Sequence, residues 1–356
     1  MPEIAANRER ILTPLFTMAD GSYDKDDARR GRSTQGESPL SFFMFRKSAA
    51  MMMPVKLIVK QGITNPFGDH RTVKQAFPSA IPSKQSDPFL MCDFFEMNEV
   101  KARDEDDFPI GWHPHRGMDI ATYLRKGIGR HGDSLGTRET FDAPGMQWMS
   151  VGSGVEHAEG GAFDGLLEGF QIWINVPKEK KMADPRYGTV SSKDLPLVEL
   201  EGGAGTALIL AGDALNARGQ FETVQEVQMI DFRIETGASL DFRVNDGLDT
   251  AILYFYEGDK ISVNDKSDIH VGSVILLDAD SNKHRSINVK TKDNKAGVML
   301  FAGKKLKEPI AWHGPIVMNT DEQIQATYRE MRSGKFPPKR VAWDYKKSAA
   351  FPKNEL

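Results

Sequence analysis

The chain has 356 residues, of which 40% are hydrophobic and 27% are charged, and its net charge is -4. This composition is typical of a globular protein and excludes the fibrous classes, while the length favours two domains. Because 46 basic residues are balanced by 50 acidic ones, the chain has no excess of positive charge for a polyphosphate backbone. We therefore expect no direct nucleic-acid partner.

No apolar stretch approaches the length that spans a bilayer, and the most hydrophobic short run is "SFFMF" at 41–45. We therefore expect no membrane partner. The N-terminus lacks the pattern of a signal peptide, and its acidic residues disfavour a mitochondrial transit peptide. The single cysteine, Cys92, cannot form an internal disulfide and is interpreted as a small buried hydrophobic residue. These features predict a cytoplasmic protein, with the nucleus as the other candidate.

Residues 1–53 are charged, contain Ser and Gly, and have no sustained periodicity, so we predict that they are disordered. From "VKLIVKQG" to about residue 305, short strand-like runs are separated by Gly, Pro, Asn and Asp. Examples are "ATYLRKG", "GFQIWINVP", "GTALILAGD" and "MIDFRIETG". Many short strands with almost no helical periodicity predict an all-β protein of antiparallel sandwiches or barrels, with enough strands for two.

One helix is predicted near the C-terminus, over about 321–333. Thr320 and Gln323 have the spacing of a capping box, and Gly334 stands where a helix is expected to end. Its apolar face would be formed by Ile324, Tyr328 and Met331.

The stretch "GWHPHRGMDI" places His113 and His115 on either side of Pro114. In a strand, residues two apart point to the same side, so both imidazoles would project from one face. Neutral imidazole is a common metal ligand, and this pair would form half of a metal site. A single H-x-H pair is a weak signal by itself.

The same spacing recurs in "VGSGVEHAEGG", where His157 and Glu159 follow a glycine-rich turn. A second strand would therefore direct one imidazole and one carboxylate to a single face. Three histidines and one glutamate from two strands of one barrel are a typical ligand set for a mononuclear divalent metal. The sequence predicts one such site.

An ordered set of motifs resembles the pirin family of the cupin superfamily, from about Lys56 to about Phe336. The motifs are "HPHRGMDIATYLRKG", "HGDSLG", "QWMSVGSGVEHAE", "QIWINVP" and "GPIVMNTDEQI". The resemblance implies a bicupin of two antiparallel jelly-roll barrels with one iron ion, Fe²⁺, in the first barrel. It also implies the metal ligands His113, His115, His157 and Glu159, which are the four residues already identified from their spacing.

The expected domains are an N-terminal cupin over 54–190 with the metal site, a C-terminal cupin over 191–310 without metal, and a C-terminal segment over 311–356. His270 and His284 are the only histidines between 190 and 305, and neither has a ligand-type neighbour two residues away in a convincing strand. We therefore expect no second metal ion.

Two departures from the family pattern could reshape the pocket. Asp119 stands where the family usually has Glu, and the turn in "DAPGMQWM" is altered. The stretch "GIGRHG" at 127–132 matches a dinucleotide-binding pattern, but no apolar helix follows it, so this match is rejected.

Other candidate residues carry less weight. His131 is interpreted as a surface histidine in a turn, with a position around the metal as the alternative. His70 and His313 are interpreted as structural or exposed. Trp148 and Trp173 are expected in the core rather than in a pocket wall, and Gln147 is equally compatible with a place near the metal or an ordinary strand position.

The resemblance implies two functions of different classes. The first is an oxygenase similar to quercetin 2,3-dioxygenase, in which a flavonol presents its 3-hydroxyl and carbonyl to the metal and Glu159 accepts the hydroxyl proton. The second is a non-enzymatic, iron-dependent and redox-sensing transcriptional co-regulator that binds a protein partner. The fold is common to both functions and does not decide between them. The metal could also be manganese, nickel, cobalt or zinc, and we expect a monomer.

Overall fold

The computed structural model describes residues 52–66, 71–99, 108–162, 165–280 and 283–347. The predicted disordered segment lies outside these ranges as far as residue 51, as does His70. Met53, at the end of that segment, is fully buried in an apolar core, and its N–H donates to the Ser286 carbonyl at 2.7 Å. Neither α-helix within the described ranges combines the length and the hydrophobicity of a membrane-spanning segment.

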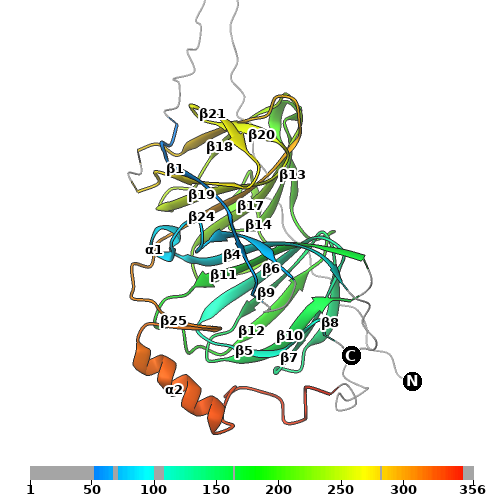
Figure 1. The fold of residues 1–356 in the computed structure, drawn as a ribbon, viewed down its shortest axis with the longest axis vertical. Coiled ribbons are helices and arrows are strands. Elements are labelled where there is room, and N and C mark those ends of the chain that lie inside the picture. Colours follow the sequence, from blue (N-terminus) through cyan, green and yellow to red (C-terminus); the bar gives the residue numbers. More distant parts are fainter. Residues whose placement is uncertain (1–51, 67–70, 100–107, 163–164, 281–282, 348–356) are drawn as a thin grey trace, which may run out of the picture. The chain divides into compact units, whose positions relative to one another are not determined.

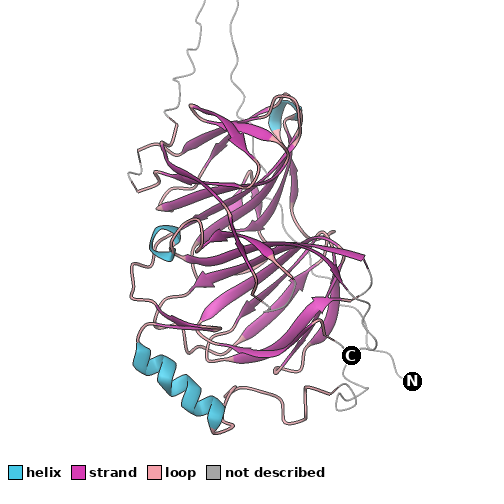
Figure 2. Cartoon of the chain, in the orientation of Figure 1, coloured by secondary structure: helices cyan, strands magenta, loops and turns pink. Residues whose placement is uncertain are grey.

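The described residues form two antiparallel barrels, as the strand pattern predicted (Figure 2). The first barrel pairs a seven-stranded sheet, ordered β12-β9-β6-β11-β4-β3-β2, with a four-stranded sheet, ordered β5-β10-β7-β8. Its strands are β2 (Gly62–Thr64), β3 (Val73–Phe77), β4 (Phe89–Glu99), β5 (Ile110–His115), β6 (Met118–Lys126), β7 (Ile128–Asp133), β8 (Arg138–Asp142), β9 (Gly145–Ser150), β10 (Val155–Gly161), β11 (Gly165–Asn175) and β12 (Arg186–Val190). The short helix α1 (Ser83–Ser86) precedes β4.

The second barrel repeats this design with a seven-stranded sheet, β1-β22-β19-β24-β17-β14-β13, and a four-stranded sheet, β18-β23-β20-β21. Its strands are β1 (Val55–Lys60), β13 (Leu197–Glu199), β14 (Gly205–Ala211), β17 (Val227–Ile234), β18 (Ser239–Arg243), β19 (Thr250–Glu257), β20 (Lys260–Val263), β21 (Lys266–His270), β22 (Ser273–Leu277), β23 (Ser286–Lys290) and β24 (Ala296–Gly303). A 3-10 turn (Glu201–Gly203) and a small hairpin, β15 (Asp213–Ala214) with β16 (Ala217–Arg218), lie between these strands.

The first strand of the described chain joins the second barrel. β1 pairs antiparallel with β22, and Ile58 lies opposite Ile275. In Figure 1, β1 is therefore the blue strand at the edge of a sheet that otherwise comes from the second half of the chain. Local periodicity predicts that 55–60 is a strand, but it carries no information about which sheet that strand joins.

The central strands of the first barrel are buried on both faces. One set of alternating β4 residues lines a cavity inside this barrel, namely Met91, Asp93, Phe95 and Met97. The residues between them, Cys92 and Phe94, pack in a core shared by the large sheets of both barrels, where the rings of Phe94 and Tyr256 lie 5.3 Å apart. Burial on both faces explains why "PFLMCDFF" is a nearly continuous apolar run. Cys92 is buried as expected, and burial raises the pKa of its thiol well above the usual value.

The C-terminal segment returns to the first barrel. It contains the hairpin β25 (Ala311–His313) and β26 (Ile316–Met318), followed by helix α2 (Asp321–Arg332). The predicted helix and its capping box are confirmed, because the Thr320 hydroxyl accepts from the Gln323 N–H while the Gln323 side chain accepts from the Thr320 N–H. The hairpin meets the end of β5, where the Val317 N–H donates to the Arg116 carbonyl at 3.0 Å.

The glycine-rich stretch at 127–132 belongs to strand β7 and the turn before it, and the chain continues into β8. A Cβ atom at Gly129 would lie 2.6 Å from the Phe141 ring, so this glycine allows close packing inside the barrel. The strand context agrees with the rejection of a dinucleotide-binding loop.

Candidate metal centre

Two neighbouring strands of the small sheet bring three histidines together. β5 and β10 pair antiparallel, with His157 directly opposite His113, and His115 lies on the same face of β5 as His113. One ring nitrogen from each of the three lies within 4.8 Å of the others. The ring centroids of His113 and His157 are 4.3 Å apart, and those of His115 and His157 are 4.9 Å apart.

The ring nitrogens have lone pairs to offer. His113 Nδ1 lies 2.8 Å from the Gly111 carbonyl, which can only accept, so Nδ1 carries the proton and Nε2 keeps its lone pair. Among the described residues, neither ring nitrogen of His115 or His157 has a hydrogen-bond partner of normal geometry. A buried polar atom without a partner is unfavourable, and coordination of a divalent transition metal ion would satisfy these nitrogens. The cluster therefore fits such an ion.

Burial also favours the neutral form of two of these imidazoles, His115 and His157. It lowers the pKa of His115 and His157 well below the usual value, and charge on His113 acts in the same direction. The Pro315 carbonyl acts weakly in the opposite direction on His115. A neutral imidazole has the free lone pair that a metal ligand requires.

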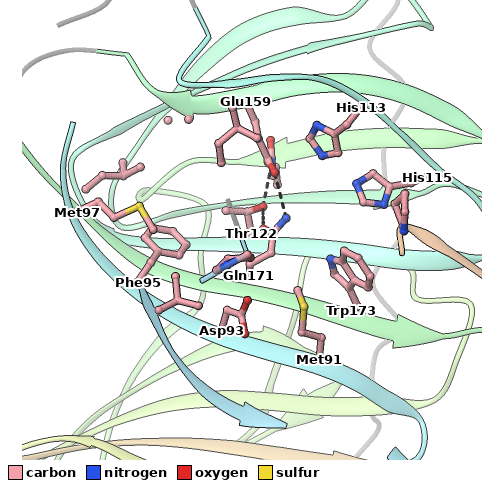
Figure 3. A pocket seen from close by; sticks show the side chains of 18 of the residues that line it. Met91, Asp93, Phe95, Met97, His113, His115, Thr122, Glu159, Gln171 and Trp173 are labelled. Carbon is pink, nitrogen blue, oxygen red and sulfur yellow. Dashed lines mark hydrogen bonds between the residues drawn. The ribbon is translucent and has the colours of Figure 1, made fainter. Parts of the chain in front are cut away.

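Glu159 lies beside the three histidines. Its Oε1 is 4.0 Å from His157 Nε2, and the side-chain amides of Gln171 and Gln147 donate to its two oxygens at 3.2 and 3.1 Å (Figure 3). Both carboxylate oxygens are thus held toward the interior of the barrel. Glu156, on the other face of β10, instead accepts from the Tyr345 hydroxyl and pairs with Lys346. The alternation expected along this strand therefore holds.

Further side chains support this arrangement. The Tyr187 hydroxyl donates to Gln147 Oε1 at 3.2 Å, so Gln147 connects Tyr187 to Glu159. His131 stacks on Tyr187 with ring centroids 4.2 Å apart, and its Nε2 lies 3.1 Å from Asp133 Oδ2. The expectation that His131 is a surface residue is wrong, because β7 lies between β10 and β8 and places this side chain fully inside.

Two of the histidines, His113 and His115, line a cavity of about 660 Å³ inside the first barrel, together with Glu159. Its walls are largely apolar and include Met91, Phe95, Met97, Leu124, Phe141 and Trp173. Trp173 was expected in the core, but its ring faces this cavity and lies 5.2 Å from the ring of His115. Trp312 and Pro315 of the C-terminal segment complete the wall.

Asp119 and Trp148 lie on the other side of the large sheet. Trp148 is part of the shared core, as expected, and its indole N–H donates to Asp119 Oδ2 at 3.0 Å. Asp119 lines a separate, smaller cavity. Consecutive strand residues alternate between faces, so Asp119 does not line the cavity beside the histidines. This departure from the family pattern therefore does not alter that cavity's wall directly.

The remaining histidines of the described chain lie away from this cluster. His313 is exposed, with its Nδ1 2.7 Å from the Tyr328 hydroxyl, in agreement with its interpretation. His270 is exposed at the end of β21, and His284 lies in the loop before β23. Within the described ranges, His113, His115 and His157 form the one group of three or more potential ligand side chains that converge.

Asp93 is a residue of this cavity that the sequence patterns did not indicate as a site residue. This side chain is 5% exposed and lines the cavity, and burial raises its pKa to about 6 while the Gln75 amide acts in the opposite direction. The available signal was one acidic residue inside the apolar run "PFLMCDFF". Its position relative to the histidines depends on cross-strand pairing, which a single strand does not reveal.

Comparisons with known proteins agree with this architecture. The Pirin family model matches residues 70–174, and the model of the Pirin C-terminal cupin domain matches residues 229–337. A protein of Pseudomonas aeruginosa, provisionally named a quercetin 2,3-dioxygenase, is 32% identical over 70% of this chain and 86% of its own length. Human pirin is 31% identical over 71% of this chain and 83% of its own length.

A crystal structure of quercetin 2,3-dioxygenase from Acinetobacter baumannii superimposes with a TM-score of 0.73 and 26% identity. The superposition covers 81% of this chain and 99% of that structure. The motifs, the two barrels and these matches lead to one conclusion: the chain belongs to the pirin family and is a bicupin.

Proposed function

We propose that the protein holds one divalent transition metal ion, Fe²⁺, on His113, His115, His157 and Glu159, and that it oxygenates a flavonol-like substrate. The observation that carries this proposal is the cluster of three imidazoles, two of which, His113 and His115, line a cavity of about 660 Å³. Similarity to proteins named as quercetin 2,3-dioxygenases supports the substrate class.

The cavity suits a small aromatic molecule. Binding sites for small molecules are mostly apolar hollows of roughly 300–1,000 Å³ with a few placed polar groups, and this cavity agrees with that description. Trp173, Met91 and Phe95 offer flat or adaptable apolar surface for a planar ring system.

The ion, Glu159 and the two glutamines that contact Glu159 have separate proposed roles. The ion, when bound, would supply Lewis acidity and a template for the hydroxyl and carbonyl oxygens of the flavonol. We assign to Glu159 the acceptance of the hydroxyl proton, since its oxygens lie beside the histidine cluster. Gln147 and Gln171 are positioning residues that hold the carboxylate through their amides.

The test is flavonol turnover by purified, metal-loaded protein in air, followed as loss of the near-ultraviolet absorbance of the substrate. Iron, manganese, nickel, cobalt and zinc forms are compared in parallel, and iron is expected to be the most active. His157→Ala should abolish turnover, while Glu156→Ala, on the opposite face of β10, should retain it.

Absence of turnover with every metal would overturn the oxygenase proposal. If the iron form then binds a protein partner with an affinity that depends on the oxidation state of iron, the co-regulator function replaces it. We further propose a monomer in the cytoplasm or nucleus, where a single buried cysteine is ordinary.

A further inference from the structure

One buried carboxylate in the cavity has an oxygen without a donor. Asp93 lies on β4 and points into the cavity from the wall opposite His113, His115 and Glu159 (Figure 3). Gln75 Nε2 donates to Asp93 Oδ1 at 2.7 Å. Among the described residues, no side chain or backbone N–H donates to Asp93 Oδ2.

The neighbours of Asp93 are already engaged elsewhere. Gln171 lies directly opposite Asp93 in the sheet, but its amide donates to Glu159 and its oxygen accepts from Thr122. The oxygen of Gln75 accepts from the Ser79 hydroxyl. The side chains that flank Asp93 across the sheet therefore provide no donor for Oδ2, and the Asp93 side chain lines the cavity.

The pairing of β4 with β11 places Asp93 near the candidate metal ligand Glu159, with Gln171 between them. Gln171, on the adjacent strand, holds Glu159 directly. Since neighbouring strands lie about 5 Å apart, the carboxylate of Asp93 stands roughly one strand spacing from the side chain that positions Glu159. A planar ligand that reaches the histidines would thus have its remote part within reach of Asp93.

We propose that Asp93 is the specificity-determining residue of this cavity: its free oxygen accepts a hydrogen bond from a phenolic hydroxyl on the part of the ligand remote from the histidines. This inference rests on the proposed function. It narrows the substrate class to flavonols that carry a further hydroxyl beyond the one adjacent to the carbonyl.

The chemistry of the wall supports a neutral hydroxyl donor. Burial raises the pKa of Asp93 to about 6, so the carboxyl is mostly ionised at neutral pH and incompletely solvated. An O–H donor on an aromatic ring would satisfy this oxygen while its ring contacts Met91 and Phe95. Hydrogen bonds to a charged acceptor are stronger than those between neutral groups.

The experiment is an equilibrium binding titration of metal-loaded protein without oxygen, so that no ligand is consumed. Two ligands are compared: 3-hydroxyflavone, which has only the hydroxyl beside the carbonyl, and quercetin, which has further hydroxyls on both ring systems. The full chain should bind quercetin more tightly by roughly ten- to hundred-fold, and Asp93→Asn and Asp93→Leu should remove most of this preference.

Asp119→Asn is the matched control. Asp119 is a buried carboxylate of the same barrel whose pKa burial also raises to about 6, but it lines the other cavity. This variant should keep the preference for quercetin. Metal content is measured in every variant, and the Asp93 variants should retain it.

The outcomes separate the two proposals. If Asp93→Asn and Asp93→Leu keep the preference for quercetin, the role of Asp93 is wrong, while binding of 3-hydroxyflavone that is lost in His157→Ala still supports the proposed function. If the unchanged chain binds neither flavonol, the proposed function fails and the role of Asp93 falls with it. If a variant does not fold, flavonols that lack single hydroxyls are titrated into the unchanged chain, and equal affinity for all of them would overturn the inference.

Discussion

His157 shows how single residues reveal this site. The side chain is fully buried, and neither of its ring nitrogens has a hydrogen-bond partner among the described residues. A desolvated nitrogen without a partner destabilises a fold, so its retention points to a ligand that completes it. His113 and His115 each place a ring nitrogen near those of His157, and a metal ion requires this convergence whereas a structural histidine does not.

The first prediction concerns the four assigned ligands. His157→Ala removes an imidazole donor, and Glu159→Gln removes the negative charge that offsets a divalent cation while it keeps the shape of the side chain. Both should weaken metal binding by roughly ten- to hundred-fold or more, since even changes beyond the direct ligands reach that range. The measurement is a competition titration with a chromophoric chelator.

Glu156→Ala is the control for this prediction. Glu156 contacts Tyr345 and Lys346 on the other face of β10, so its removal should leave metal affinity nearly unchanged. If Glu156→Ala strips the metal while Glu159→Gln retains it, the assignment of Glu159 as a ligand is wrong.

The second prediction follows from the pKa of Asp93, which burial raises to about 6 from an unfolded value near 3.9. Between these values the folded state binds more protons than the unfolded state, so this residue makes the protein less stable as pH rises from about 4 to 6. Asp93→Asn removes that dependence. Without metal, the free energy of unfolding of this variant should exceed that of the unchanged chain by up to about 3 kcal/mol at pH 8, and the difference should shrink toward pH 4.

Urea denaturation at several pH values measures this difference. Asp293→Asn, an exposed substitution between β23 and β24, serves as the control and should follow the unchanged chain. A difference for Asp93→Asn that stays constant from pH 4 to 8 would contradict the account.

Spacing along one strand predicts some of these residues but not others. His113 and His115, or His157 and Glu159, share a face because they are two residues apart, so a single sequence suffices to find them. Asp93 and His131 face the same interior only through the pairing of separate strands, and that pairing is not encoded locally. The prediction that Trp173 lies in the core was wrong for a related reason. The strand pattern shows that an aromatic residue points inward, but it does not show whether the interior of the barrel is filled or hollow.

At the scale of elements, the end of β5 is joined to helix α2 by Arg116. This side chain is 2% exposed, follows the candidate ligand His115, and donates to the Thr327 hydroxyl at 2.8 Å and to Glu330 at 2.5 Å. Its Nε donates to the Ser153 carbonyl at 2.8 Å. Helix α2 follows the second barrel in sequence, yet it supports β5, the strand of the first barrel that carries the candidate ligands His113 and His115.

The third prediction tests this connection. Thr327→Val keeps the shape of the side chain but removes the oxygen that accepts from the buried guanidinium, so unfolding free energy should fall by about 1–3 kcal/mol. Ser333→Ala removes an exposed hydroxyl at the end of the same helix and should change stability by less than about 0.5 kcal/mol. Urea denaturation of the full chain compares the two variants, and equal effects would show that Arg116 does not depend on Thr327.

The elements differ in how far local sequence predicts them. The helix α2 is specified by its own capping box and apolar face, which explains why its position was predicted within a residue. The strand β1 is equally visible as a strand, but its partner β22 lies more than two hundred residues later. Cross-strand partners this distant are chosen by tertiary packing, which no local pattern reports.

At the scale of the whole described chain, the two barrels share one design but differ inside. The interior of the second barrel is filled by a large apolar cluster that includes Ile230, Phe232 and Leu253. The interior of the first is hollow and carries the histidines on β5 and β10. Large aromatic side chains between the barrels, with Tyr123 and Tyr256 both donating to the buried Asp231, join them through their large sheets.

We propose that the first barrel alone holds metal, through His113, His115, His157 and Glu159. The most direct test of this proposal is elemental analysis of the purified full chain together with His157→Ala and a double variant at His270 and His284. The account predicts about one transition metal ion per chain, unchanged in the double variant and lost in His157→Ala. Two tightly bound ions per chain, or one ion retained by His157→Ala, would contradict it.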